Sequence, residues 1–224
     1  FSLEKVHKAG AVFDLEKLGW FNFQWQKRVH TQKLEHIARE IDPKVDIQET
    51  DRGHATYAFT SGSGASRFEE QRAALLLEIC GTHIPRDWVG KPFIGRALIT
   101  VEEKILKSPA EISEQISFYV TAKKFNRDLM LSEKMKVDEN VAKTALSESA
   151  SLLESLDESA FNNMQKLQDE LIGLAQKLGL KNGQLLWPLR VALTGEQFSP
   201  GVFEVLWVLG KEESIRRVKS LIHE

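Results

Sequence analysis

The sequence predicts an all-α fold, and three observations lead to that prediction. Apolar residues recur at helical spacing along most of the chain, and short Gly, Pro and acidic segments separate the periodic stretches. Strand-like alternation is almost absent. No repeat of about 30–45 residues is visible, which argues against a regular solenoid. We therefore expect helices packed as a bundle around a shared core.

The N-terminal part predicts a short helix that begins at Ser2, two further helices and then an irregular segment. Asp14 is a suitable N-cap for a helix over 15–29, and apolar spacing predicts another over 31–41. Residues 42–66 are rich in Gly, Ser and Asp and predict a loop, with one weak strand over 56–60. Within it, residues 62–66 resemble a phosphate-binding nest. They lack the Lys-Ser/Thr of a P-loop, so a flexible linker is the favoured interpretation.

Helical periodicity then continues to the C-terminus. Pro109 and Pro200 lie where a helix begins, Asp138 and Asp157 are acidic caps, and Gly195 is a helix stop. The expected helices cover 67–79, 93–106, 109–122, 138–156, 157–178, 183–195, a segment from 200, and 211–222.

Composition limits the class of protein. The chain has 224 residues and a formal net charge of −2, which allows one large or two modest domains and argues against a strongly basic nucleic-acid arm. Its longest apolar runs are far shorter than the roughly 18 residues of a membrane span. The single cysteine, Cys80, excludes a disulfide framework and favours a reducing compartment. Since the chain starts at Phe1 without a signal peptide, we expect an excised fragment of a cytoplasmic protein.

Charge is distributed unevenly along the C-terminal half. Residues 137–170 hold eight acidic side chains and two lysines, whereas residues 171–224 hold seven basic and five acidic side chains. One interpretation is that one face repels polyanions and another accepts them. The other is an ordinary solvated helix surface, and composition leaves both open.

No catalytic or metal-binding constellation stands out. Cys80 and His83 would need two further ligands to hold a metal ion, so a buried thiol beside a loop histidine is the favoured interpretation. The aromatic run in the first long helix is suited to base stacking, but at helical spacing it more often belongs to the core. Its members are Trp20, Phe21, Phe23 and Trp25.

Two long segments at opposite ends resemble one family. The first is 1–22, with its runs Phe13-Asp14, Lys17-Leu18 and Trp20-Phe21-Asn22. The second comprises Pro188-Leu-Arg-Val-Ala-Leu-Thr-Gly195, Ser199-Pro-Gly-Val-Phe-Glu204 and Leu209-Gly-Lys-Glu212. In the same order, they resemble the segment after the catalytic domain and the anticodon-binding part of bacterial-type glutamyl-tRNA synthetases.

The resemblance implies a helical bundle or cage in three parts. Residues 1–41 would end a stem-contact region, residues 42–150 would form a first anticodon-binding subdomain with a polar insertion near 42–95, and residues 151–224 would form a second. The implied partner is tRNA for glutamate, and whether glutamine tRNA is also a substrate stays open. We expect a monomer with no membrane association.

The departures from the family pattern are as informative as the matches. The HIGH and KMSKS signatures, which hold ATP in this family, are absent, so the fragment itself is expected to catalyse nothing and to need no cofactor. The parent enzyme would use ATP and magnesium to attach glutamate to tRNA. Phe23 stands where the family has glycine.

The resemblance also implies four anticodon-binding residues. Arg190, Ser199 and Val202 match family positions that touch anticodon bases. Lys104 is the nearest match, offset by one residue, to an arginine that discriminates the third anticodon base. From the residues alone, Arg190 on its apolar helix either supports the bundle or directs its fork at a phosphate or base.

A rival from another class is a helical protein–protein scaffold without a nucleic-acid role, with the aromatic run lining its groove. A stand-alone enzyme that uses Cys80 and His83 is a more distant alternative.

Overall fold

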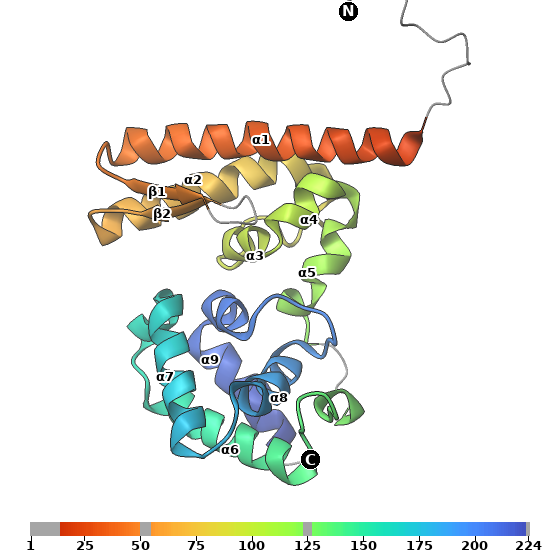
Figure 1. Ribbon diagram of the computed structural model, residues 1–224, viewed down its shortest axis with the longest axis vertical. Helices are drawn as coiled ribbons and strands as arrows, with labels where there is room; N and C mark the ends of the chain where they lie inside the picture. The colour runs from red at the N-terminus through yellow and green to blue at the C-terminus, as the bar shows by residue number, and fades with distance from the viewer. Residues whose placement is uncertain (1–13, 50–54, 123–126, 223–224) are drawn as a thin grey trace, which may run out of the picture. The chain divides into compact units, whose positions relative to one another are not determined.

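The computed structural model describes residues 14–49, 55–122 and 127–222. Over these residues the all-α prediction is confirmed, since helices account for nearly all regular structure and only one two-stranded sheet is present (Figure 1). Residues 1–13, which carry the short helix expected from Ser2 and much of the first family-like segment, lie outside them. The described residues divide between 65 and 66 into two compact units, which we describe separately.

The N-terminal unit begins with one long helix, α1 (Leu15–Ile41), where the sequence predicted two. Asp14 caps it as expected, because its carboxylate accepts a hydrogen bond from the Lys17 backbone N–H at 3.0 Å. No Gly or Pro interrupts the residues around 30, so the backbone continues as a helix. The predicted break was therefore wrong.

The predicted loop after α1 contains a β-hairpin. Strands β1 (Asp46–Glu49) and β2 (Ala55–Ala58) pair antiparallel, with Ile47 opposite Tyr57. Asp42 stabilises the base of the hairpin, since its carboxylate accepts from both the backbone N–H (2.8 Å) and the hydroxyl (2.6 Å) of Thr60. These hydrogen bonds lower the pKa of Asp42.

The expectation of a flexible linker at 62–66 was also wrong, because α2 (Gly62–Cys80) begins at Gly62. The Ser61 hydroxyl accepts a hydrogen bond from the Gly64 N–H at 3.1 Å, which satisfies a donor of the first turn. Glycine is a weak helix former, but this cap and the strong periodicity that follows outweigh its propensity.

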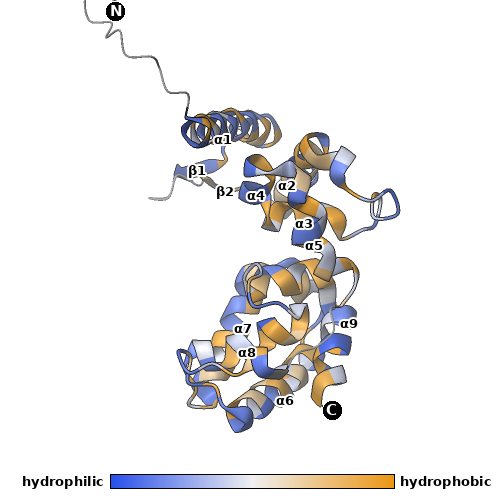
Figure 2. Cartoon of the chain, turned by 90° about the vertical axis from the view of Figure 1, so that its right-hand side faces the viewer, coloured by the Kyte–Doolittle hydropathy of each residue, from blue (hydrophilic) through white to orange (hydrophobic). Residues whose placement is uncertain are grey.

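The aromatic run of α1 does not form the core that its spacing suggested. Trp20, Phe21 and Trp25 are all more than half exposed. Figure 2 shows hydrophobic and hydrophilic residues side by side along α1. Helical spacing identifies an apolar face, but it does not say what covers that face.

The C-terminal unit contains α2 from residue 66 onward and the remaining helices. After the short 3-10 turn Gly81–His83, they are α3 (Ile94–Thr100), α4 (Glu102–Lys107), α5 (Ile112–Val120), α6 (Glu139–Ser155), α7 (Met164–Lys177), α8 (Asn182–Thr194) and α9 (Val202–Ile222). Further 3-10 turns cover Pro109–Glu111, Arg127–Met130 and Glu158–Asn162.

Three expected helices differ in detail from the observed ones. The range 93–106 is split at Val101, and the ranges 109–122 and 157–178 each begin with a 3-10 turn. At Gly210 the backbone takes φ 71° and ψ −178°, which kinks α9. The part after the kink begins at residue 211, where the sequence predicted the start of the last helix. The predicted three-part domain division stays a prediction, and its boundary at residue 150 falls within α6.

The core of this unit lies where α6, α8 and α9 pack together, with α7 beside them (Figure 1). Trp207 and Phe161 are its largest fully buried side chains. Leucines at helical spacing from α6, α7 and α8 fill the space around them. α6 and α7 each keep a solvated face, whereas α8 is buried or half-buried along most of its length. This packing holds the connection between α8 and α9 at the surface.

A buried arginine joins three of these helices. Arg217 on α9 donates from Nη1 to the backbone oxygens of Phe118 on α5 and Leu193 on α8, both at 2.7 Å. Its Nη2 donates to the Tyr119 oxygen at 3.2 Å. Its Nε donates to Glu213 at 2.6 Å, so the buried charge is paired. The two neighbouring arginines, Arg216 first, lower the pKa of Glu213.

We expect Arg217→Ala to destabilise the chain by about 3–5 kcal/mol, because it removes a buried paired charge and leaves three carbonyls without a donor. Arg216 is a matched control: it also binds Glu213, but its side chain is 61% exposed against 3% for Arg217. Arg216→Ala should therefore cost at most about 1 kcal/mol. Urea unfolding measures both, and equal losses would contradict the role assigned to Arg217.

Candidate nucleic-acid interface

The connection between α8 and α9, residues 195–201, is held in place by Arg190. The guanidinium Nη1 donates to the Ser199 hydroxyl at 2.9 Å and to the Ser199 backbone oxygen at 3.4 Å. Its Nη2 donates to the Gln197 backbone oxygen at 3.0 Å. The planar guanidinium of Arg190 thus binds the residues directly before and after residue 198.

An aromatic ring supports the same arginine. The guanidinium carbon of Arg190 lies 4.8 Å from the ring centre of Trp187, which is within cation–π range. The Trp187 Nε1 donates to the Leu129 backbone oxygen at 3.0 Å, and this fixes the ring. Partial burial lowers the pKa of Arg190, but arginine remains charged at neutral pH.

Both ends of the loop are also capped. Gly195 closes α8 in the left-handed conformation (φ 69°), which favours glycine. At the other end, the Glu204 carboxylate accepts from the Gly201 N–H at 2.6 Å. Burial raises the pKa of Glu204. The loop is therefore a rigid projection between two helices.

The structure brings two of the four predicted residues into contact. Arg190 and Ser199 are hydrogen-bonded as described above. Val202 is the first residue of α9, with its side chain only 5% exposed, so it packs beneath the loop. Lys104 lies on α4 and donates from Nζ to the Gln115 side chain at 2.6 Å, so it takes no part in the hydrogen bonds between Arg190 and the loop.

Sequence reasoning missed two aromatic residues of this site. Trp187 precedes Arg190 by three positions on a helix, and this spacing places both on one face, so a signal was present. Phe198 is an apolar residue inside a polar turn, which is an unusual choice at such a position. Its side chain is 82% exposed.

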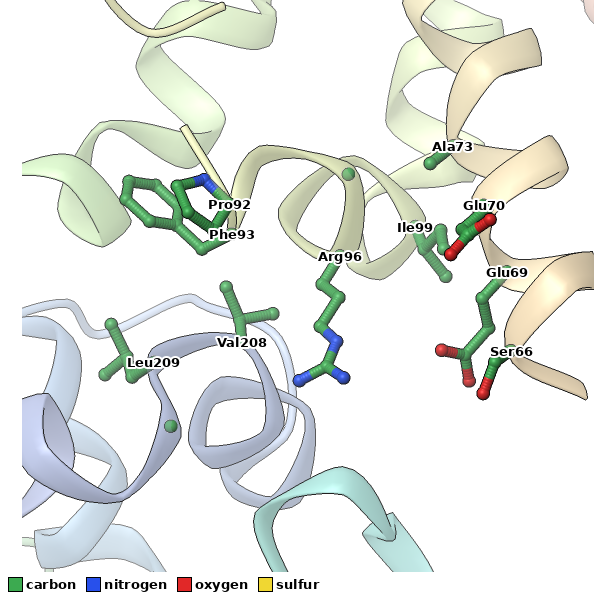
Figure 3. Close-up of a pocket in the computed structure, with 12 residues that line it drawn as sticks. Ser66, Glu69, Glu70, Ala73, Pro92, Phe93, Arg96, Ile99, Val208 and Leu209 are labelled. Carbon is green, nitrogen blue, oxygen red and sulfur yellow. The ribbon is translucent and has the colours of Figure 1, made fainter. Parts of the chain in front are cut away.

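A cavity of about 720 Å³ lies elsewhere in the same unit, between α2, α3 and the kink of α9. Figure 3 shows Arg96 extending between Val208 on one side and Glu69 on the other. Arg96 is engaged, because it donates to the Trp207 backbone oxygen at 3.0 Å and lies over the Trp207 ring. Glu69 and Glu70 make the opposite wall acidic, so the cavity does not suit a phosphate group.

Cys80 is a buried thiol, as expected. Its side chain is fully buried and its sulfur donates to the Leu76 backbone oxygen at 3.0 Å. Burial raises the pKa of Cys80 to about 11, which is opposite to the shift that a nucleophile needs. His83 lies on the exposed turn that follows. Within the described residues, no three His, Cys, Asp or Glu side chains are grouped to hold a metal ion.

Among the helices that the structure describes, none is both long enough and apolar enough to cross a membrane.

Solved structures with the same fold are known. Over its full length the chain resembles a glutamate tRNA ligase from Elizabethkingia meningosepticum, with a TM-score of 0.60, 24% identity and coverage of 35% of that chain. The glutamate–tRNA synthetase of Elizabethkingia anophelis gives a TM-score of 0.54 at 22% identity, over 34% of its chain. The fold is thus that of a helical region found in glutamate–tRNA ligases.

Family comparison is more specific. The family model described as anticodon binding domain matches residues 73–222, so the chain belongs to the anticodon-binding domain family. It is 27% identical over 220 residues to the glutamate–tRNA ligase of Clostridium tetani and 36% identical over 221 residues to that of Clostridium botulinum strain Eklund 17B. In each case 98% of this chain matches 36% of the relative, so the chain spans about a third of the relatives' length.

These comparisons confirm the resemblance that the sequence suggested and give no support to the protein–protein scaffold. The matched region contains Arg190, Ser199, Val202 and Lys104.

We predict that the Cys80 thiol resists modification in the folded chain. At pH 8 it stays protonated, since its pKa is raised to about 11, and it is buried. With 5,5′-dithiobis(2-nitrobenzoate), the native chain should react at least about 100-fold more slowly than the urea-unfolded chain, whose thiol has an ordinary pKa of about 8.5. Cys80→Ala gives the reagent blank, and rapid native reaction would contradict the burial.

Proposed function

We propose that this chain binds tRNA through the anticodon stem-loop, as part of a glutamate–tRNA ligase. The observation that supports this most directly is the rigid loop 195–201, held by Arg190 inside the family-matched region. Anticodon bases are unstacked and present free edges, which proteins recognise by stacking and hydrogen bonding. An ordered loop that is held by a positively charged arginine suits such a target.

Each predicted residue has a role in this proposal. Arg190 supplies positive charge and fixes the loop, and its remaining N–H groups contact a base or phosphate. Ser199 shapes the turn through its hydroxyl, and Val202 supports it from the core. Lys104 contributes a point charge to a second contact with the anticodon. The acidic wall near Glu69 is expected to lie outside the RNA footprint.

The longer protein would ligate glutamate to tRNA with ATP and magnesium, bound by parts other than this chain. The chain itself would be catalytically silent and monomeric, and would work in the cytoplasm. Purified chain should accordingly give no ATP–pyrophosphate exchange with glutamate, whether or not tRNA is present.

We predict that Arg190→Ala weakens binding of an anticodon stem-loop by about 5- to 150-fold, as expected for loss of about 1–3 kcal/mol at one base contact. Arg190→Lys should be intermediate, because it keeps the charge but loses the fork. Lys177→Ala, at an exposed lysine on α7, is the control and should change little. Fluorescence anisotropy gives the affinities. Equal binding of unrelated loops, unchanged by Arg190→Ala, would refute anticodon reading.

A second prediction concerns tRNA discrimination. Lysine distinguishes base edges poorly, whereas arginine binds them through two parallel donors. Lys104→Arg should therefore raise the preference for glutamate over glutamine anticodon loops. Lys107→Arg, also exposed on α4, is the matched control. If both variants leave the ratio of the two affinities unchanged, Lys104 does not read the anticodon.

A further inference from the structure

Phe198 occupies the tip of the loop that Arg190 holds. Its side chain is 82% exposed, the most exposed large hydrophobic side chain in the described part of the chain. The residues on either side of it are fixed, since Arg190 donates to the Gln197 oxygen at 3.0 Å and to the Ser199 hydroxyl at 2.9 Å. The ring is therefore presented to solvent by an ordered backbone.

The loop does not need this ring for its own structure. The capping hydrogen bonds at Gly201 and Gly195 and the arginine contacts involve backbone and polar groups only. A turn of this kind normally carries Gly, Asn, Asp or Ser, which are solvated without cost. The exposed phenyl ring contributes little to the packing of the chain, and its position on a loop fixed by Arg190 makes it available for contact with a bound molecule.

The surroundings define the chemistry of that contact. Phenylalanine offers a flat apolar face, and the guanidinium of Arg190 lies beneath the same loop. A ligand that places a flat aromatic group next to negative charge is an unpaired nucleobase on its phosphate backbone. Stacking accepts any base, because every base has a π face.

The geometry also separates two roles. One side of the Arg190 guanidinium faces Trp187, and Nη1 and Nη2 donate to the loop. One face of the guanidinium and the donors on Nη1 and Nη2 that bind the loop are thus used within the chain. Arg190 therefore positions the loop in addition to its own contact with the RNA, and Phe198 offers the exposed aromatic ring on which a base can stack.

We propose that Phe198 stacks on an unpaired base of the bound RNA loop and that Arg190 holds the ring in place for this contact. The inference rests on the proposed anticodon binding, and it assigns the base-stacking residue of that site.

The test compares substitutions at one position. Phe198→Ala should weaken binding of the anticodon stem-loop by about 5- to 150-fold, the range for loss of one stacked base. Phe198→Tyr should bind within about threefold of the parent, and Phe198→Leu should fall close to Ala, since leucine is apolar but cannot stack. Trp25→Ala removes another exposed aromatic side chain, on α1, and should leave binding unchanged.

Two further readouts identify stacking. The slope of log affinity against log salt concentration should be the same for the parent and Phe198→Ala, because no phosphate contact is lost. A second set of stem-loops lacks one base each, at successive positions. When the missing base is the one that stacks on Phe198, Phe198→Ala should cause no additional loss of affinity, because the contact is already absent. The thermal midpoint of Phe198→Ala should match the parent, which separates lost contact from lost folding.

The outcomes distinguish the two proposals. Parent-like binding by Phe198→Ala or Phe198→Leu, with Arg190→Ala still weakened, would overturn the stacking role and leave anticodon binding intact. A parent chain that binds no stem-loop would overturn both. An altered salt slope in Phe198→Ala would also overturn stacking, since the loss of affinity would then come from a changed contact between a basic side chain and a phosphate.

Discussion

The C-terminal unit depends on the buried Arg217. Its guanidinium satisfies carbonyl groups at the end of α5 and on α8 while its charge is paired with Glu213 on the same helix. Helix ends leave carbonyl groups without partners, and burying them without donors is costly. One arginine with a fork of donors solves this problem for two helices at once, so the ends of α5, α8 and α9 are joined by polar contacts as well as by apolar packing.

The same kind of contact appears at the candidate RNA-binding surface, where the arginine is only half-buried. Arg190 also binds carbonyl oxygens, but those of a surface loop, and it is supported by Trp187 instead of a carboxylate. Without a paired acid, its positive charge remains available to an anion. A rigid helical scaffold thereby positions a loop that carries function, which is where binding residues are commonly found.

Arginine also links α3 to the core. Arg96 donates to the Trp207 backbone oxygen and to the Asn162 side chain at 2.8 Å, and its guanidinium lies over the Trp207 ring. The Trp207 ring is thus packed in the core and also contacts the Arg96 guanidinium. These contacts fix α9, the helix that follows the candidate loop. The kink at Gly210 then redirects α9, so that Arg217 reaches α5.

The sequence by itself determined most of the helices and where several of them begin or end. Asp14 and Asp138 cap helices as predicted, and Gly195 ends α8, because capping depends on a few neighbouring residues. The family-like motifs also placed Arg190 and Ser199 in one site. Only the tertiary structure decided that Trp20, Phe21 and Trp25 of α1 are exposed, that Val202 is buried and that Phe198 lies exposed on the loop that Arg190 holds. Burial and the direction of a side chain depend on what other segments of the chain pack against it, and no local pattern carries that information.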